Sequence, residues 1–513
     1  MNKKLRQQLA RRRQRLTKRI DPQNWNGQSP MFDPPAIHYE LAERTQAVSV
    51  GGLGVVQQLV KQLGLAESIN RTCPIFRLRL PYSEADHVLN IAYNVMAGGT
   101  CLEHLELRRT DEAYLNAVGA QRIPDPTTAG DFCRRFTAWD VFALMESFHE
   151  ARLQVWQQQP DSFFDLAEIE ADGTMVETDG EHKEGIGINY KGQWGYHPLV
   201  VTLAQTREVL YLVNRSGNRP SHERASVYID RSIDLCRRAG FRKIRLRGDT
   251  DFSQTRQLDG WHEQRVEFVF GMDATPNLVR IAEELPDSAW KELRRPQPPE
   301  KKRRARRPNY KQQIVVEKEY TNKQLEREFV AEFEYSPTNC RYTYRMVVLR
   351  KQISVTKGQQ KLFDDSPYFF YITNVPARTL PPSGIVRQSN QRCDQENIIG
   401  DLKQMGALSA PVNTLVSNWA WMVMATLAWN LKAWLALSLP EPEPDPDDRK
   451  QPARSERRQL LRMSFARFRQ TVLMLPAQIV RTARRLIYRV LTWTPNLDVL
   501  LRLHDYLNPP LRT

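Results

Sequence analysis

The chain has 513 residues, with 74 Lys and Arg against 59 Asp and Glu, and its formal net charge is +15 at pH 7. This length predicts about three domains and a large core, and the excess of positive charge favours nucleic acid or an anionic membrane surface as the partner. Six scattered cysteines without a C-x-x-C pair argue against a zinc site or a disulfide framework, and indicate reduced thiols in a cytosolic protein.

The N-terminal third is predicted to be helical after a basic arm. Residues 1–35 carry clustered Lys and Arg and a Pro-rich end, and we expect them to be partly disordered. Helical periodicity then runs through a predicted DNA-binding domain at 36–160. Within it Thr128 is a candidate N-cap for a short helix that carries Arg134 and Arg135. Such a helix fits a helix-turn-helix reader of DNA, although any small helical bundle can contain one.

The period changes in residues 161–274. Three strand-like stretches are followed by a helix, a strand, a second helix and a fifth strand. The first helix is expected to open with a Ser N-cap and to close at Gly240. This order predicts an α/β (α+β) fold with a mixed sheet, because a dinucleotide-binding fold would not begin with three consecutive strands.

The remainder divides into four predicted segments. Residues 275–384 open with a basic stretch, "KKRRARR" at 301–307, and then read as a β-rich insertion. Residues 385–438 return to helix and end in a Trp-rich run, for which a buried core helix is favoured over a membrane span because Asn and Lys interrupt it. A Pro-rich acidic linker at 439–455 leads to a basic tail at 456–513, predicted to be helical.

Two Asp residues stand where predicted strands end. Asp172 closes the first strand of the mixed sheet and Asp249 closes the fourth, and these two strands are expected to lie side by side. A later helix holds "RCDQENIIGDLK", in which Arg392, Glu396 and Lys403 are spaced to share one helical face. Taken in isolation, the spacing of Arg392 and Glu396 favours an exposed ion pair, and a strand-end Asp is often only a turn former.

Convergence of Asp172, Asp249 and Glu396 would create a site for hard cations. Three carboxylates repel one another unless cations lie between them, and oxygen ligands suit two Mg²⁺ ions, which Mn²⁺ can replace. Such a pair of ions supports in-line phosphoryl transfer. Asp251 is a rival to Asp249, and Glu170 is a rival to Asp172.

The sequence resembles the DDE transposases of bacterial insertion sequences, and it is most similar to the group named for insertion sequence family 1380. The matching stretches extend over most of the chain: "GGLG" at 51–54, "TTAGDFCRRF" at 127–136, "DGT" at 172–174, "GYHPL" at 195–199, "GN" at 217–218, "RGDTDF" at 247–252, and the R-x3-E-x6-K signature of Arg392, Glu396 and Lys403. The resemblance implies a ribonuclease H-like core, interrupted by a β-rich insertion before the helix that bears the Glu.

The resemblance also implies a function. The helical N-terminal region would bind the terminal inverted repeats of a mobile element, and Asp172, Asp249 and Glu396 would bind two Mg²⁺ for cut-and-paste transposition through a hairpin end. Double-stranded DNA, as element ends and target, would be the partner of a homodimer without membrane contact, in the bacterial cytoplasm at the nucleoid. The basic residues expected to grip DNA are Arg392, Lys403, Arg134, Arg135, Lys301, Lys302, Arg303 and Arg304.

Two alternatives stay open at this point. A transposase-derived protein that binds DNA without cutting it is one, because related enzymes have Tyr where this chain has Ser389. A metal-dependent nuclease that cleaves without joining is the other. His197 is expected to be structural, and most insertion aromatics (Tyr342, Tyr344, Tyr368, Phe369, Phe370 and Tyr371) are expected to pack, although stacking on a flipped base is the other option.

Overall fold

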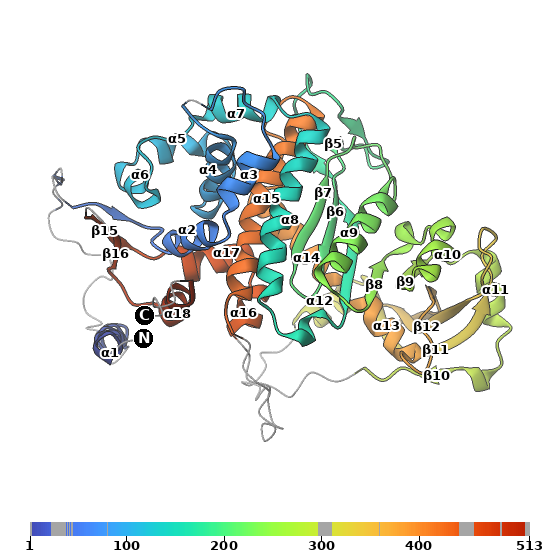
Figure 1. Cartoon of the computed structure of the whole chain (residues 1–513). Coiled ribbons are helices and arrows are strands. Elements are labelled where there is room, and N and C mark those ends of the chain that lie inside the picture. The colour runs from blue at the N-terminus through green and yellow to red at the C-terminus, as the bar shows by residue number, and fades with distance from the viewer. Residues whose placement is uncertain are drawn as a thin grey trace. The chain divides into compact units, whose positions relative to one another are not determined.

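A computed structural model describes residues 3–21, 37, 39–40, 42, 45–79, 81–295, 310–358, 360–440, 456–482 and 485–507. The chain forms two compact units, shown together in Figure 1. Unit 1 comprises Met1–Phe163, Gly173–Arg219 and Glu396–Thr513. Unit 2 comprises Phe164–Asp172 and Pro220–Gln395. Lys301 to Arg304 and most of the predicted linker at 439–455 lie outside the described residues.

Unit 1 is mainly helical. Its helices are α1 (Lys3–Arg19), α2 (Leu53–Gln62), α3 (Leu65–Thr72), α4 (Glu84–Met96), α5 (His104–Arg109), α6 (Glu112–Val118), α7 (Pro126–Arg134), α8 (Ala138–Gln157), most of α14 (Cys393–Gln404), α15 (Leu415–Leu437), α16 (Glu456–Arg462), α17 (Phe465–Phe468) and α18 (Leu497–Leu507). Its strands are β1 (Ala47–Val48), β3 (Val176–Glu177), β4 (Gly187–Ile188), β5 (Trp194–Tyr196), β6 (Leu199–Leu203), β7 (Glu208–Val213), β15 (Ala477–Arg481) and β16 (Leu486–Val490).

Unit 2 is built on a sheet. Its strands are β2 (Ala167–Gly173), β8 (Ile244–Gly248), β9 (Glu267–Met272), β10 (Lys291–Glu292), β11 (Thr321–Tyr335), β12 (Tyr344–Lys357), β13 (Gln360–Asp365) and β14 (Tyr368–Thr373). Its helices are α9 (Ala225–Ala239), the short 3-10 helix η3 (Thr250–Phe252), α10 (Thr255–Glu263), α11 (Pro276–Glu283), α12 (Tyr310–Glu317) and α13 (Pro382–Gln391).

The Trp-rich helix α15 forms the centre of unit 1. Every residue from Ser417 to Leu437 is buried, as expected of a helix that is apolar on all sides. It packs against α4, α8 and α16 and along β7, and Figure 1 shows it running beside α8. This confirms the predicted core helix. In the part of the chain that has been described, no helix is both long and apolar enough to cross a membrane.

Polar side chains of α15 and α8 form hydrogen bonds with the backbone and side chains of β7. The Asn430 amide accepts from the Val209 N–H at 2.9 Å and donates to the Val209 carbonyl at 3.1 Å, as a neighbouring strand would. The buried Glu208 carboxylate accepts from Arg152 Nε at 2.9 Å, Trp156 Nε1 at 2.8 Å and Trp434 Nε1 at 2.7 Å. These bonds let a charged group lie inside an apolar core.

Lys432 is a second charged residue inside this core. Its Nζ donates to the Leu461 carbonyl at 3.2 Å and lies 4.0 Å from the centre of the Trp429 ring. Burial lowers the pKa of Lys432 from its ordinary 10.5 to about 7, and the Asp401 carboxylate opposes this shift. Between these two values the unfolded chain holds a proton that the folded chain lacks, so this residue makes the free energy of unfolding rise with pH.

In Lys432→Met this contribution disappears. We expect the free energy of unfolding of the wild type to increase relative to the variant as the pH rises from 7 to about 10, and the difference to stay constant below pH 6. Urea unfolding of both proteins across this pH range measures the difference in the free energy of unfolding, and a variant of an exposed lysine, Lys61→Met, is the control. A difference that does not change with pH would contradict the buried position of the ammonium group.

The sheet of unit 2 has the strand order β10-β11-β12-β14-β9-β8-β2, and β13 pairs with β12. β2 and β8 are parallel, and so are β8 and β9. β14 then pairs with β9 in antiparallel register, so the β-rich insertion continues the core sheet instead of forming a separate one. α13 packs on this sheet, with Ile385 and Val386 buried against Val269 and Val347.

The predicted order of the core elements is confirmed. Along the chain it runs β2, β6, β7, α9, β8, α10 and β9, which is a mixed α/β arrangement. Two details differ from the prediction. The second strand is interrupted, since β5 pairs with β3 and β4 in a small sheet before β6 begins. α9 has no Ser cap and starts after Arg224 in the left-handed conformation, although it does end at Gly240 as expected.

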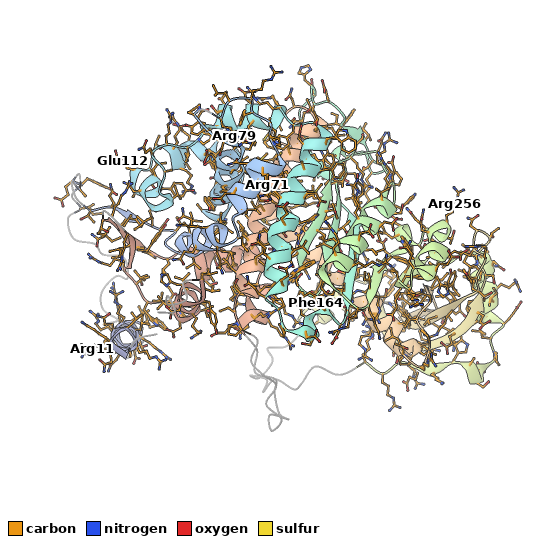
Figure 2. All side chains as sticks on the ribbon, viewed as in Figure 1. Arg11, Arg71, Arg79, Glu112, Phe164 and Arg256 are labelled. Atoms are coloured by element: carbon orange, nitrogen blue, oxygen red, sulfur yellow. The ribbon has the colours of Figure 1, made fainter. Side chains whose placement is uncertain are left out.

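Two further expectations about the helical regions, the cap of α7 and an entirely helical C-terminal region, were wrong, and the N-terminal arm contains a helix that was not predicted. The cap of α7 is Asp125, whose carboxylate accepts from the Thr128 N–H, with Pro126 in the first turn. The basic arm contains the helix α1, on which Figure 2 labels Arg11. The C-terminal region is helical only in part, because β15 pairs with both β16 and β1.

Candidate active site

Asp172 and Asp249 stand at equivalent positions of two neighbouring parallel strands. β2 and β8 pair from Ala167 with Ile244 to Glu170 with Arg247. Continuing this register by two residues places Asp172 opposite Asp249, on the same face of the sheet. The prediction that these two strands lie side by side is therefore confirmed, and their carboxylates meet at the carboxyl edge of the sheet.

Arg392 lies between the two carboxylates. Its Nη1 is 3.4 Å from Oδ2 of Asp172 and 3.4 Å from Oδ2 of Asp249. The Arg392 and Asp172 side chains are only 19% and 16% exposed. Burial raises the pKa of Asp249 above its ordinary value, and the Arg392 guanidinium opposes the shift. Two carboxylates directly opposite each other repel, so a cation between them stabilises this edge of the sheet.

The preceding positions on the same face of β2 and β8 carry opposite charges. Arg247 Nη2 lies 2.7 Å from Glu170 Oε1, and Arg245 Nη1 lies 3.4 Å from Glu168 Oε1. Burial raises the pKa of Glu170 to about 7 against the attraction of Arg247. Glu170 thus has a facing Arg, whereas Asp172 faces another carboxylate. Of these two candidate ligands, Asp172 is therefore the one whose charge an additional cation would neutralise.

The positions of Asp249 and its rival Asp251 also differ. Asp249 Oδ1 accepts from the Asp251 N–H at 3.1 Å and so caps η3, which leaves Oδ2 directed to Arg392. Asp251 belongs to η3 beyond the strand end and is exposed. The geometry pairs Asp249, and not Asp251, with Asp172.

Arg247 also connects the strands to α13. Its Nη1 donates to Gln388 Oε1 at 2.9 Å and to Gln391 Oε1 at 3.1 Å, and its side chain is 4% exposed. These two Gln residues occupy the last turns of α13, directly before Arg392. Arg247 therefore fixes the helix end from which Arg392 reaches the two Asp residues. Sequence reasoning did not identify this residue.

The signature residues do not share one uninterrupted helix as expected. Arg392 is the C-cap of α13, and Glu396 and Lys403 lie on α14, which begins at Cys393. Unit 2 ends at Gln395, so Glu396 belongs to unit 1 and its convergence with the two Asp residues stays a prediction. Among the described residues, no group of three or more His, Cys, Asp or Glu is arranged to hold a metal ion.

Lys403 lies near the small sheet of unit 1. Desolvation lowers the pKa of Lys403, and the carboxylate of Glu177 on β3 opposes this shift. α14 ends shortly afterwards, where Gly406 adopts a positive φ and its N–H donates to the Lys403 carbonyl at 3.0 Å.

The predicted DNA-contacting Arg residues of α7 are both exposed. Arg134 pairs with Asp131 at 2.6 Å and donates to Asn413 at 3.0 Å, and Arg135 lies over the Phe76 ring. Arg71 and Arg79, labelled in Figure 2, are also exposed in this region, and they pair with Glu150 and Glu84. Whether DNA binds here stays a prediction.

The remaining candidates have structural partners. The His197 N–H donates to the Arg215 carbonyl at 2.8 Å, and Arg215 Nε donates to the His197 carbonyl at 3.0 Å. Burial raises the pKa of Tyr371, and the neighbouring Ser389 side chain opposes this shift. Of the insertion aromatics, Tyr344, Phe370 and Tyr371 are buried, whereas Tyr342 and Phe369 are exposed.

Comparisons with known proteins identify the family of the chain. A family model described as "Transposase DDE domain group 1" matches residues 42–510, a range that includes every predicted metal ligand. The more specific similarity to insertion sequence family 1380 stays a prediction. Comparison with curated proteins gives no match. Among solved structures, the chain is similar to "Cryo-EM structure of piggyBac transposase synaptic complex with hairpin DNA (SNHP)", with 10% identity, a TM-score of 0.31, and coverage of 92% of this chain and 89% of that chain.

Proposed function

Because the chain belongs to the transposase DDE domain family, we propose that it cuts the ends of an insertion sequence and joins them to target DNA. One strand at each end is hydrolysed, and the released 3′-OH attacks the opposite strand to give a hairpin end. Once the hairpin is reopened, the freed 3′-OH attacks a phosphodiester of the target. The reaction is cut-and-paste transposition in the bacterial cytoplasm, at the nucleoid.

The observation that carries the proposal is the pair of Asp172 and Asp249 with Arg392 between them. In the preceding register positions a carboxylate faces an Arg, and only at the strand ends do two carboxylates face each other. Repulsion between two facing carboxylates destabilises the fold unless a cation binds between them. Arg392, at 3.4 Å from both, already occupies the place of positive charge.

The donor set fits a hard divalent cation. We assign Asp172, Asp249 and Glu396 as the ligands of two Mg²⁺ ions, with Mn²⁺ as a substitute, because all three offer anionic oxygens. When bound, the two ions supply an activated oxygen nucleophile and neutralise the charge that develops on the leaving oxygen. The protein holds Asp172 and Asp249 in place through the β2–β8 register and holds Arg392 through α13.

The other parts of the chain bind DNA in this proposal. Arg392 and Lys403 contact phosphates next to the scissile bond. The helical N-terminal region binds the terminal inverted repeats, with Arg134 and Arg135 exposed for that contact. Lys301 to Arg304 bind the DNA phosphate backbone through electrostatic attraction. Two copies act together as a homodimer on paired ends.

One assay tests the proposal. The purified protein is incubated with Mg²⁺, a labelled duplex carrying the terminal inverted repeat and a target plasmid, beside Asp172→Asn and Glu396→Gln. We expect nicked, hairpin and joined products with the wild type, and binding without cleavage with both variants. Binding without cleavage by the wild type would support an inactive DNA-binding protein instead. Cleavage without joining would support a nuclease.

A further inference from the structure

Arg392 is placed where it competes with a metal ion. Its Nη1 is 3.4 Å from Oδ2 of both Asp172 and Asp249, and each of these side chains is at least two-thirds buried. A guanidinium group stays charged at any physiological pH, so it cannot leave this position by losing a proton. A divalent cation bound to the same two oxygens would repel it.

The backbone of Arg392 is held by hydrogen bonds that do not involve its side chain. The Arg392 N–H donates to the Ser389 carbonyl at 3.2 Å, and the Arg392 carbonyl accepts from the Gln395 N–H at 2.9 Å. Arg247 holds the end of α13 through Gln388 and Gln391. The backbone hydrogen bonds and the Arg247 contacts are thus independent of which anion the Arg392 guanidinium binds.

Guanidinium groups bind phosphate as well as carboxylate, in the same forked geometry. A DNA phosphate that reaches the site offers Arg392 a new anionic partner as the carboxylates turn to the metal. Before binding, two carboxylates and one Arg leave the site with an excess of negative charge. One divalent ion together with one phosphate monoanion neutralises that excess.

We propose that Arg392 is the resident counter-ion of the metal site, and that it exchanges Asp172 and Asp249 for a DNA phosphate when divalent metal binds. This inference rests on the proposed metal site. Its consequence is reciprocal coupling, because a ligand that removes Arg392 from the carboxylates helps the other ligand to bind. The protein then holds metal more tightly when DNA is present.

The test measures Mn²⁺ affinity by electron paramagnetic resonance, without any cleavage. Wild type, Arg392→Gln and the control Arg387→Gln, an exposed Arg on the same helix, are titrated with Mn²⁺ in the absence and presence of an end duplex. The duplex carries a non-hydrolysable linkage at the cleavage position. Without DNA, we expect Arg392→Gln to bind Mn²⁺ about tenfold more tightly than the wild type.

Addition of DNA separates the remaining outcomes. We expect the wild type and Arg387→Gln to gain about tenfold in Mn²⁺ affinity, and Arg392→Gln to gain little. Equal Mn²⁺ affinities of the wild type and Arg392→Gln without DNA would overturn the exchange while leaving the metal site intact. Absence of Mn²⁺ binding in every protein, or binding that survives in Asp249→Asn, would overturn the metal site itself and the exchange with it.

Discussion

Asp249→Asn is expected to lower cleavage of an end duplex by at least about a thousandfold, which corresponds to about 4 kcal/mol in the activation free energy. Asn keeps the size of the side chain and removes the charge that a divalent cation requires. The folded protein is expected to be as stable as the wild type or more stable, because Arg392 keeps Asp172 as its partner and the repulsion between the carboxylates is lost. Single-turnover cleavage rates and thermal unfolding midpoints measure the two effects.

Asp251→Asn is the matched control, since it removes the same charge two residues away. Asp251 is exposed on η3, and we expect its loss to change the cleavage rate by no more than a few-fold. Loss of cleavage in Asp251→Asn together with retained cleavage in Asp249→Asn would reassign the second metal ligand. A large loss of stability in Asp249→Asn would show that the residue is structural.

Glu208→Ala is expected to produce the largest loss of stability in unit 1. It removes the acceptor of Arg152, Trp156 and Trp434 and leaves the buried guanidinium of Arg152 without its carboxylate. Removing one partner of a buried ion pair lowers the free energy of unfolding by about 3–5 kcal/mol. Trp fluorescence during urea unfolding measures this loss of stability, because the indoles of Trp156 and Trp434 donate to Glu208.

Glu106→Ala serves as the control for this variant. Glu106 pairs with Arg109 on α5 at 2.8 Å, but both side chains are nearly half exposed. We expect its unfolding midpoint to match the wild type, because exposed ion pairs contribute little. Equal midpoints for Glu208→Ala and the wild type would show that the Glu208 network does not stabilise the core.

Much of unit 2 was predictable because its elements are locally encoded. Alternating apolar residues predicted the strands, and Gly240 predicted the end of α9. Two Asp residues at strand ends then predicted the paired edge of the sheet. The buried helix α15 was predictable from its length and from the Asn and Lys residues that interrupt its apolar sequence. Asn430 contacts β7 and Lys432 contacts α16.

Other features depend on contacts between distant parts of the chain. β15 pairs with β1, which lies more than 400 positions earlier, so no local pattern identifies that sheet. The continuous sheet of unit 2 likewise depends on β14 returning to β9.

One signal was present in the sequence and was missed. Charged residues alternate with apolar or small residues along both strands. They are Glu168, Glu170 and Asp172 on β2, and Arg245 and Arg247 on β8 with Asp249 directly after it. With a period of two, these residues share one face, and their pairing predicts the buried ion pairs beneath the site. The role of Arg247 in holding α13 also requires the position of that helix, which the two strands alone do not provide.

The central claim is that Glu396 joins Asp172 and Asp249 around the same divalent ions, and metal-directed cleavage of the protein tests it most directly. Fe²⁺ is bound in place of Mg²⁺, and ascorbate with peroxide generates hydroxyl radicals that cut the polypeptide beside the ion. We predict cuts close to residues 172, 249 and 396, all suppressed by excess Mg²⁺ and absent in Asp249→Asn. Cuts near 172 and 249 without one near 396, or cuts near none of the three, would contradict the claim.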